Sequence, residues 1–272
     1  MYNYSFFQWV AFFCIYCFIG WLFESIYVSI EYRKWVNRGF LNGPFLPIYG
    51  FGAIIMLFCS LPVRKSTILV FFFGMAGATA LEYFTGYVME KIFHVKYWDY
   101  SYEPFNVNGY ICLGCSIMWG FLSVVLVKII HTPVENLILG INSKVLIILD
   151  ILFAAGFVSD LIMSAREAFD LRRIIDEKIL QNEKVLRLQK RVDVLMAFIN
   201  DDKEKLQEKL ESSKAELERI KLELTGAREK YIDRIEKYKK NANRVIKRNP
   251  GSTSGKHRVE FNEIREWLSK KQ

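Results

Sequence analysis

The feature that most constrains this 272-residue chain is the separation of its apolar residues from its charged ones. Up to Ala165 the sequence is dominated by Phe, Ile, Leu, Val and Gly, whereas Lys, Glu, Arg and Leu dominate from Arg166 to Gln272. A helix of ~20 apolar residues is long enough to cross the ~30 Å hydrocarbon layer of a bilayer. We therefore expect residues 1–165 to lie in a membrane and the remainder of the chain to lie in water.

Five apolar runs predict an all-α, multi-pass transmembrane helical bundle. The runs are Phe6–Ile30, Pro44–Leu61, Ser66–Met89, Tyr110–Ile130 and Val145–Ala165. The first is too long and too aromatic for a cleavable signal peptide, so we expect it to stay attached as a span. The second begins with Asn42-Gly43-Pro44 and Pro47, which predict irregular backbone that neighbouring protein must shelter.

Lys and Arg in the short loops predict the orientation, because these groups resist translocation. Positive charges follow the first run (Arg33, Lys34 and Arg38) and the third run, and they open the tail at Arg166. We therefore expect a cell-membrane protein with its N-terminus outside and its tail in the cytoplasm. The pair Arg64-Lys65 argues against this assignment, because it lies in the loop after the second run, which is then on the outer side.

The tail predicts a coiled coil over residues 166–249, since apolar positions alternate three and four apart from Val185 to Ile199 and beyond. Asp201 and Glu204 have the spacing of a capping box, which predicts an interruption near Asn200. One long rod, in a homo-oligomer paired through this coiled coil, and a hairpin folded back on itself both fit. Residues 250–272 predict a flexible linker followed by a short basic amphipathic helix.

Composition and motifs exclude several functions. The net charge of +8 comes from the tail and the loops, which suits anionic membrane lipids as partners better than nucleic acid. No phosphate-binding loop, dinucleotide fingerprint or hydrolase motif occurs, so we assign no catalytic residue and no cofactor. The pairs Cys14/Cys17 and Cys112/Cys115 differ in predicted depth by ~20 Å, so we expect no metal site.

Four acids, Glu24, Glu82, Asp150 and Asp160, fall inside the predicted spans. An acid that faces lipid costs ~2.5 to 3.5 kcal/mol or more, so each should face protein or a water-filled cavity. For Glu24 and Glu82 two interpretations stay open. They line a polar pocket that opens to the cytoplasm, or they reach water at the ends of their helices.

A repeated pattern favours the pocket. Gly39-Phe40-Leu41 and then Ile48-Tyr49-Gly50-Phe51 recur, with identical spacing, as Gly109-Tyr110-Ile111 and Met118-Trp119-Gly120-Phe121. Each copy follows a span that carries a Glu, and the second copy has a longer loop before it. The pattern predicts a duplicated two-span unit plus one further helix, although a chance match in Gly- and aromatic-rich sequence also fits.

The region from Phe6 to Phe169 resembles the family called putative ABC-transporter type IV, or CmpB-like. The resemblance is carried by Gly20-Trp21-Leu22-Phe23-Glu24, Arg38 to Gly50, Leu81-Glu82-Tyr83, Thr85-Gly86, Trp98-Asp99-Tyr100-Ser101, Pro104-Phe105-Asn106, Ile111-Cys112-Leu113 and Trp119-Gly120. It implies a multi-pass bacterial membrane protein labelled as a transporter permease, with no established substrate or catalytic residue. Val107 and Asn108 stand before Gly109 and Tyr110 stands after it, where an Arg would be expected in many relatives, and this departure argues against a cationic ligand-binding group at that point.

We therefore expect a transport component, ABC permease-like, whose cytoplasmic-side pocket binds a small polar or lipid-headgroup ligand. The candidate pocket residues are Glu24, Arg38, Asn42, Glu82, Glu90, Trp98, Asp99 and Asn106. Transport driven by ATP would need a separate ATPase subunit as partner. Two alternatives stay open: an enzyme acting on lipid or isoprenoid phosphates, with Asp99 or Glu82 as acid or base, and a sensor or scaffold acting through its coiled coil.

Overall fold

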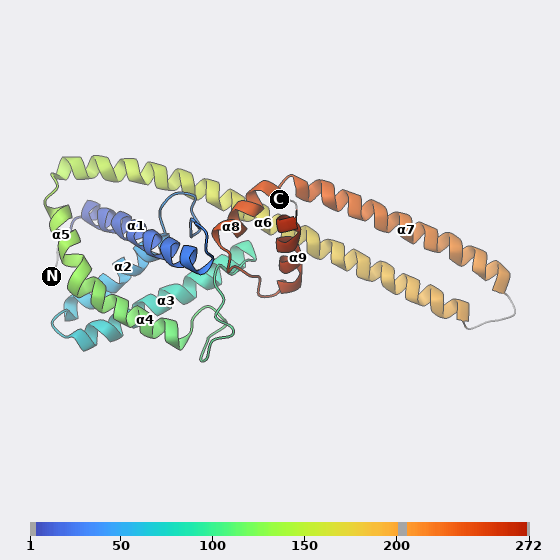
Figure 1. Cartoon of the computed structure of the whole chain (residues 1–272), viewed down its shortest axis with the longest axis horizontal. Coiled ribbons are helices and arrows are strands. Elements are labelled where there is room, and N and C mark those ends of the chain that lie inside the picture. Colours follow the sequence, from blue (N-terminus) through green and yellow to red (C-terminus); the bar gives the residue numbers. More distant parts are fainter. Residues whose placement is uncertain (1–3, 201–205, 271–272) are drawn as a thin grey trace. The chain divides into compact units, whose positions relative to one another are not determined.

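The computed structural model describes residues 4–200 and 206–270. Within these ranges every regular secondary-structure element is a helix. This confirms the predicted all-α class. The chain forms two compact units (Figure 1). Unit 1 comprises Met1–Ala168 and Arg244–Gly255, and unit 2 comprises Phe169–Asn243 and Lys256–Gln272. The predicted domain boundaries at residues 165/166 and 249/250 do not coincide with the boundaries of these two units, and they stay a prediction.

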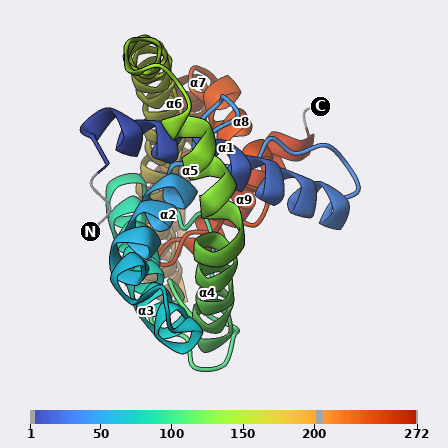
Figure 2. The same cartoon turned by 90° about the vertical axis from the view of Figure 1, so that its left-hand side faces the viewer.

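Unit 1 is a bundle of apolar helices. Its elements are α1 (Phe6–Glu31), α2 (Pro47–Ser60), the 3-10 turn η1 (Leu61–Val63), α3 (Thr67–Phe93), α4 (Leu113–Val125), the π-helical turn η2 (Leu126–Ile130), α5 (His131–Leu139) and the first part of α6 (Ser143–Asn200). Helix α2 packs against α1 and α3, and α3 packs against α4 (Figure 2).

Four helical stretches are long and apolar enough to cross a membrane. They are Phe6–Glu31, Thr67–Phe93, Leu113–Leu139 and Ser143–Leu195, which contain all of the first and fifth predicted spans and most of the third and fourth. Helix α6 does not end where the fifth span was expected to end but continues into unit 2. The chain is thus a membrane protein by length and composition of its helices.

The second predicted span is the exception. Helix α2 has 14 residues, about 21 Å of helix, which is too short to cross the hydrocarbon layer alone. The backbone before it nevertheless follows α1 closely: Arg38 N donates to Ser25 Oγ at 3.1 Å and Leu46 N to the Cys17 carbonyl at 3.0 Å. At the other end Phe58 stacks on Trp9, with ring centroids 4.6 Å apart. These contacts support a fifth crossing, half irregular and half helical, which stays a prediction.

The irregular backbone before α2 occurs where the sequence predicted it, since the helix begins only at Pro47. Non-helical backbone at membrane depth needs partners for its N–H groups, because lipid offers none. The carboxylate of Asp160 on α6 accepts from Asn42 N at 3.0 Å and from Gly43 N at 2.7 Å. Asp160 therefore holds this segment in place, and this explains one of the four acids inside the spans.

The pairs α1–α2 and α3–α4 make equivalent hydrogen bonds at the positions of the sequence repeat. Tyr49 Oη donates to Glu24 Oε1 at 2.8 Å, and Trp119 Nε1 donates to Glu82 Oε2 at 2.8 Å. Tyr49 and Trp119 occupy the same place in the two copies of the pattern. Each aromatic side chain thus binds the acid of its own helix pair.

A second set of equivalent contacts involves phenylalanines. Phe13 and Phe51 have ring centroids 4.8 Å apart, and Phe71 and Phe121 have centroids 5.1 Å apart. Phe71 follows Phe13 by the same spacing as Glu82 follows Glu24, and Phe121 follows Phe51 as Trp119 follows Tyr49. The agreement of two independent contacts supports the predicted duplication.

The core of unit 1 lies where α1, α2, α3 and α5 meet, around the first half of α1. Phe12, Leu57, Val70 and Ile138 are fully buried there. His131 is buried beside them, and its ring nitrogens lie 2.8 Å from the Tyr16 hydroxyl and 3.2 Å from the Tyr4 hydroxyl. This packing fixes one end of the bundle and leaves the end that carries Glu24 for the site described below.

Unit 2 contains the rest of α6, α7 (Leu206–Glu236), the first part of α8 (Lys239–Arg248) and α9 (Arg258–Lys270). Arg191 pairs with Glu216 and Glu223, and Arg234 pairs with Glu177 at 3.1 Å. These pairings make α6 and α7 an antiparallel hairpin, one of the two predicted arrangements (Figure 1). The coiled coil itself stays a prediction, and the expected capping box at residues 201–204 lies outside the described residues.

Helix α9 is the predicted short amphipathic helix, and it packs within unit 2. Phe261, Ile264 and Leu268 are buried, and Glu263 pairs with Lys178 of α6 at 2.8 Å. Most of its apolar face is therefore covered by the chain's own helices. The preceding residues, predicted as a flexible linker, instead place Ser252, Thr253 and Ser254 in buried positions of unit 1.

Candidate functional site

A cavity of about 370 Å³ lies inside unit 1, between α1, α2, α3, α4, the first part of α6 and the segment that follows α8. Its size falls within the ~300–1,000 Å³ range of pockets that bind small molecules. The wall is largely apolar, and the chain contributes three charged side chains to it, Glu24, Arg38 and Glu82. The cavity is therefore the place in this unit where charge meets an enclosed apolar space.

Glu24 and Arg38 form one side of the cavity. Glu24 accepts the hydrogen bond from Tyr49 and lies 3.9 Å from Arg38 Nε. The guanidinium is held by two further bonds, from Nη1 to Asn249 Oδ1 at 3.1 Å and from Nη2 to the Tyr97 carbonyl at 3.2 Å. Arg38 is thus fixed in the wall, and its charge is balanced by Glu24.

Glu82 lies on α3 and is 4% exposed. Its Oε1 accepts from the Tyr100 hydroxyl at 3.2 Å and its Oε2 from Trp119 Nε1 at 2.8 Å. Both donors are neutral, and within residues 4–200 and 206–270 no Lys, Arg or His forms an ion pair with Glu82. Glu82 is therefore held in position by hydrogen bonds but carries no counter-charge.

Aromatic side chains make up much of the wall. They are Phe40, Tyr49, Phe93, Tyr97, Trp98, Tyr100 and Trp119. Tyr49 and Trp119 meet edge to face, with ring centroids 5.7 Å apart, so the two acid-binding aromatics also contact each other. Trp98 is anchored by a 2.9 Å hydrogen bond from its Nε1 to the Tyr110 carbonyl. The rings are thus held in fixed positions around the two acids.

Two tyrosines in the loop after α3 contribute neutral phenols. Burial raises the pKa of Tyr97, and burial followed by the nearby Glu82 carboxylate raises the pKa of Tyr100, so both stay protonated at neutral pH. Tyr97 is 5% exposed, and its hydroxyl has no hydrogen-bond partner among the described residues. A buried hydroxyl without a partner is costly and uncommon, so Tyr97 has an unused donor at the cavity wall.

The segment Arg244–Gly255, from the C-terminal part of the chain, contributes Asn249 to the cavity lining. Asn249 Nδ2 donates to the Gly39 carbonyl at 3.1 Å, and Arg248 Nη2 pairs with Glu167 of α6 at 2.8 Å. Thr253 and Lys96 exchange two backbone hydrogen bonds of 2.8 and 2.9 Å. Residues more than 200 positions apart in sequence thus complete one enclosure.

Of the eight predicted pocket residues, four line the cavity: Glu24, Arg38, Glu82 and Trp98. The other four lie outside it, in local clusters of their own. Asn42 donates to Ser164 on α6 at 3.0 Å, and Asn106 donates to the Glu103 carbonyl within its own loop at 2.9 Å. The sequence pattern did not distinguish the residues that line the cavity from these four, which do not.

Glu90 and Asp99 share Lys96 outside the cavity. The ammonium lies 3.9 Å from Glu90 and 3.8 Å from Asp99, and Glu90 also accepts a 2.6 Å hydrogen bond from Tyr110. Asp99 and Glu90 thus share one ammonium group, and Asp99 does not line the cavity that contains Glu82 and Arg38. The acid–base role considered for Asp99 in the enzyme alternative stays a prediction.

The cavity residues that the predicted set missed are mostly apolar, but they include four hydrogen-bond donors: Tyr49, Tyr100, Trp119 and Asn249. For Tyr49 and Trp119 a signal was available, because both stand at matching positions of the repeat. For Tyr100 the neighbouring Trp98 was the available clue. For Asn249 no signal existed, since only the fold brings the end of α8 against the segment before α2.

The structure offers no support for metal chemistry. Within the part of the chain that the structure describes, no group of three His, Cys, Asp or Glu side chains lies close enough to hold an ion. All five cysteines are free thiols, including both C-x-x-C pairs. Cys112 Sγ accepts a 3.3 Å hydrogen bond from Cys115 N at the start of α4.

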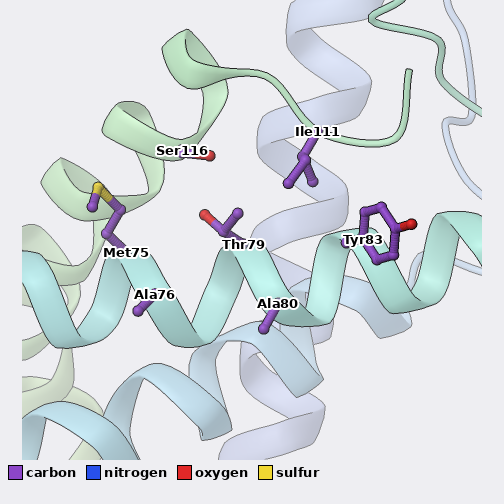
Figure 3. Close-up of a pocket in the computed structure, with 7 residues that line it drawn as sticks. All are labelled: Met75, Ala76, Thr79, Ala80, Tyr83, Ile111 and Ser116. Carbon is purple, nitrogen blue, oxygen red and sulfur yellow. The ribbon is translucent and has the colours of Figure 1, made fainter. Parts of the chain in front are cut away.

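A second hollow lies along α3 and α4 and is shown in Figure 3. It is lined by Met75, Ala76, Thr79, Ala80, Tyr83, Ile111 and Ser116. It contains no charged side chain and is more open than the cavity around Glu24 and Glu82. Because this open hollow has no charged group to recognise a polar ligand, we place the candidate site in the cavity around Glu24 and Glu82.

Comparison with known proteins gives one positive finding. A family model described as "Putative ABC-transporter type IV" matches residues 11–165, which is more than half of the chain. The matched region contains Glu24, Arg38 and Glu82. No curated protein and no solved structure matches the chain significantly.

Proposed function

Because the chain belongs to the family described as "Putative ABC-transporter type IV", we propose that it is the membrane component of a transport system and binds its ligand in the cavity between Glu24 and Glu82. The observation that carries the proposal is the placing of two acids and one guanidinium in an enclosed, aromatic-walled space. Ionisable groups at membrane depth are costly, and those that proteins keep commonly mark a pathway for substrate or ions.

The positive loops support a cavity that opens toward the cytoplasm. Arg33 and Lys34 follow α1 directly, and Lys91 and Lys96 lie at the C-terminal end of α3. These ends of α1 and α3 are the ones nearer to Glu24 and Glu82. By the positive-inside rule, this end of the bundle faces the cytoplasm and the N-terminus lies outside.

Transport driven by ATP requires a partner, because the sequence has no phosphate-binding loop of its own. We propose a separate ATPase subunit for that role. Purification of the tagged chain from its native membrane in a mild detergent, followed by mass spectrometry, tests this part. An ATPase recovered in near-equal amount supports it, whereas purification free of any nucleotide-binding protein from several detergents argues against ATP-driven transport.

Occupancy of the cavity tests the binding part directly. The full chain, extracted with its surrounding lipid into polymer nanodiscs, is examined by native mass spectrometry for a retained small molecule. Thr85 lines the cavity, so Thr85→Trp fills the space and should release the molecule. Phe84, the preceding residue, is 65% exposed, and Phe84→Trp is the matched control that should retain it.

The same experiment has a clear negative result. If wild type and Thr85→Trp retain the same mass in the same amount, the molecule is bound elsewhere and the cavity is not the site. Monodisperse size-exclusion profiles of both Trp variants show that the bundle has formed before occupancy is compared.

A further inference from the structure

We propose that the ligand of this cavity is an organic cation, a quaternary or protonated amine with an apolar body, whose charge rests against Glu82. This inference rests on the proposed function and specifies its ligand class. It follows from three features: the charge balance of the wall, the presence of a basic partner at Glu24 but not at Glu82, and the aromatic side chains around Glu82.

One of the two acids in the wall has no basic partner. Arg38 lies 3.9 Å from Glu24, and Glu82 is bound only by neutral donors, so the wall carries one negative charge whenever Glu82 is ionised. A carboxylate that is 4% exposed and has only neutral donors is unfavourable in an apolar surrounding. A cationic ligand supplies the missing counter-charge, whereas an anion would add to the imbalance.

The two copies of the repeat differ at one position that decides this charge. Arg38 stands directly before Gly39, and Asn108 stands directly before Gly109 at the matching place of the second copy. The Asn108 amide donates to the Tyr83 hydroxyl at 2.9 Å rather than to Glu82. Lys96, the nearest basic residue of that loop, is shared by Glu90 and Asp99. The second acid therefore has no substitute for the guanidinium that serves the first.

The aromatic wall suits a cation that has little hydration. A quaternary ammonium has no N–H to donate, so proteins bind it through the negative faces of aromatic rings together with a carboxylate. Tyr100 and Trp119 are in hydrogen-bond contact with Glu82, and Tyr49 contacts Trp119. These rings place π-electron density next to the uncompensated acid.

Tyr97 lines the cavity, and its hydroxyl is buried without a partner in residues 4–200 and 206–270. The apolar remainder of the wall, with Leu46, Ile48 and Met89, suits a hydrocarbon body.

Matched probes test the charge preference. We propose equilibrium binding to the full chain in phosphatidylglycerol nanodiscs with three compounds of similar shape: phenyltrimethylammonium, neutral tert-butylbenzene and anionic benzenesulfonate. The cation should bind at least about tenfold more tightly than the neutral compound, and the anion should not bind measurably. Equal binding of cation and neutral compound, or preference for the anion, overturns the proposal even without any variant.

Two variants on one helix locate the charge. Glu82→Gln keeps an acceptor for Tyr100 or Trp119 but removes the charge, so the preference for the cation should fall to within about threefold of the neutral compound. Glu90 lies on the same helix outside the cavity and is bound by Lys96 and Tyr110, so Glu90→Gln should leave the preference unchanged. A preference that survives Glu82→Gln overturns the assignment to Glu82.

The lipid composition of the nanodisc distinguishes two sources of the cation, a lipid headgroup and a soluble molecule. Nanodiscs that hold phosphatidylglycerol at one fixed fraction, with either a neutral glycolipid or phosphatidylcholine as the remainder, withhold or present a choline headgroup at the same surface charge. Severalfold weaker binding of phenyltrimethylammonium identifies a lipid headgroup as the competing occupant, and unchanged binding identifies a soluble cation; either result upholds cation chemistry. If no probe binds while Thr85→Trp still releases a native molecule, the cation class is wrong and the cavity function stands.

Discussion

At residue scale, Glu24 and Glu82 occupy matching positions but have different electrostatic surroundings. Both accept a hydrogen bond from the aromatic residue at the matching repeat position, Tyr49 or Trp119. Only Glu24 faces a guanidinium. The difference between the two sites is therefore carried by a single position, Arg38 in one copy and Asn108 in the other.

Asp160 carries the first stability prediction. Its carboxylate accepts two backbone N–H bonds and a 3.2 Å bond from Ser164. Asp160→Ala leaves those donors unpaired and should lower the free energy of unfolding by about 3 kcal/mol, whereas Asp160→Asn keeps an acceptor and should lose about half of that. Unfolding in mixed detergent micelles measures both. An Ala variant within about 0.5 kcal/mol of wild type would show that the segment before α2 does not depend on this acid.

Tyr100 carries a pH prediction. Its pKa is raised by burial and by Glu82, so the folded protein holds the phenolic proton more tightly than the unfolded chain does. The stabilisation is full below the unfolded pKa of about 10 and is lost as pH rises above it. Thermal unfolding between pH 8 and 11 should show falling stability above pH 10 and a shallower fall in Tyr100→Phe. Identical slopes in the two proteins would contradict the assigned burial.

Part of the residue-scale site could be predicted from sequence. Glu24 and Glu82 were identified because charge inside an apolar run is costly, and Arg38 because it precedes a span. Asn42, Glu90, Asp99 and Asn106 were grouped with them by proximity in sequence. Their partners, Ser164, Lys96 and the Glu103 carbonyl, are set by packing that no local pattern encodes.

At element scale, the segment Arg244–Gly255 connects two parts of unit 2 yet packs into unit 1. Arg248 is its main anchor: the side chain is 9% exposed and pairs with Glu167, which is 5% exposed. Arg244 pairs with the same acid at 3.0 Å but is 50% exposed. The two arginines therefore offer a buried and an exposed version of one interaction.

This contrast gives an element-scale prediction. Arg248→Ala should lower the free energy of unfolding by about 3 kcal/mol, because it leaves a buried acid with only an exposed partner. Arg244→Ala should cost less than about 1 kcal/mol. Adding Glu167→Gln to Arg248→Ala should recover part of the loss. Equal losses in the two single variants would show that the segment is not anchored through Arg248.

The long elements were predictable and their ends were not. Hydrophobic length located α1, α3, α4 and the membrane part of α6, but the fourth run was predicted to end at Ile130, before α5. The fifth span was predicted to end at Ala165 with a charged helical tail behind it. Helix α6 runs through this residue without a break, so the point at which it leaves the membrane stays a prediction. The linker predicted at Pro250–Gly255 is packed, because Thr253 pairs with Lys96, a contact between distant segments.

At the scale of the whole molecule, the number of crossings decides the topology. Five crossings place the loop at Arg64-Lys65 outside and the loop at Arg33-Lys34 inside, whereas a helix α2 that does not cross would place both on one side. Single cysteines at Lys34 and Lys65, in a chain without its five native cysteines, report this through an impermeant maleimide applied to intact cells. We expect labelling at Lys65 only; labelling of both positions or of neither would contradict five crossings.

The central claim is that the cavity bounded by Glu24, Glu82 and Tyr97 holds a ligand. The most direct measurement is an electron cryomicroscopy map of the chain in polymer nanodiscs drawn from its native membrane, without detergent. The account predicts density within the cavity that touches Glu82 and Tyr97 and that is absent from Thr85→Trp. A wild-type cavity closed by its own side chains, or filled only with water-sized peaks, would contradict it.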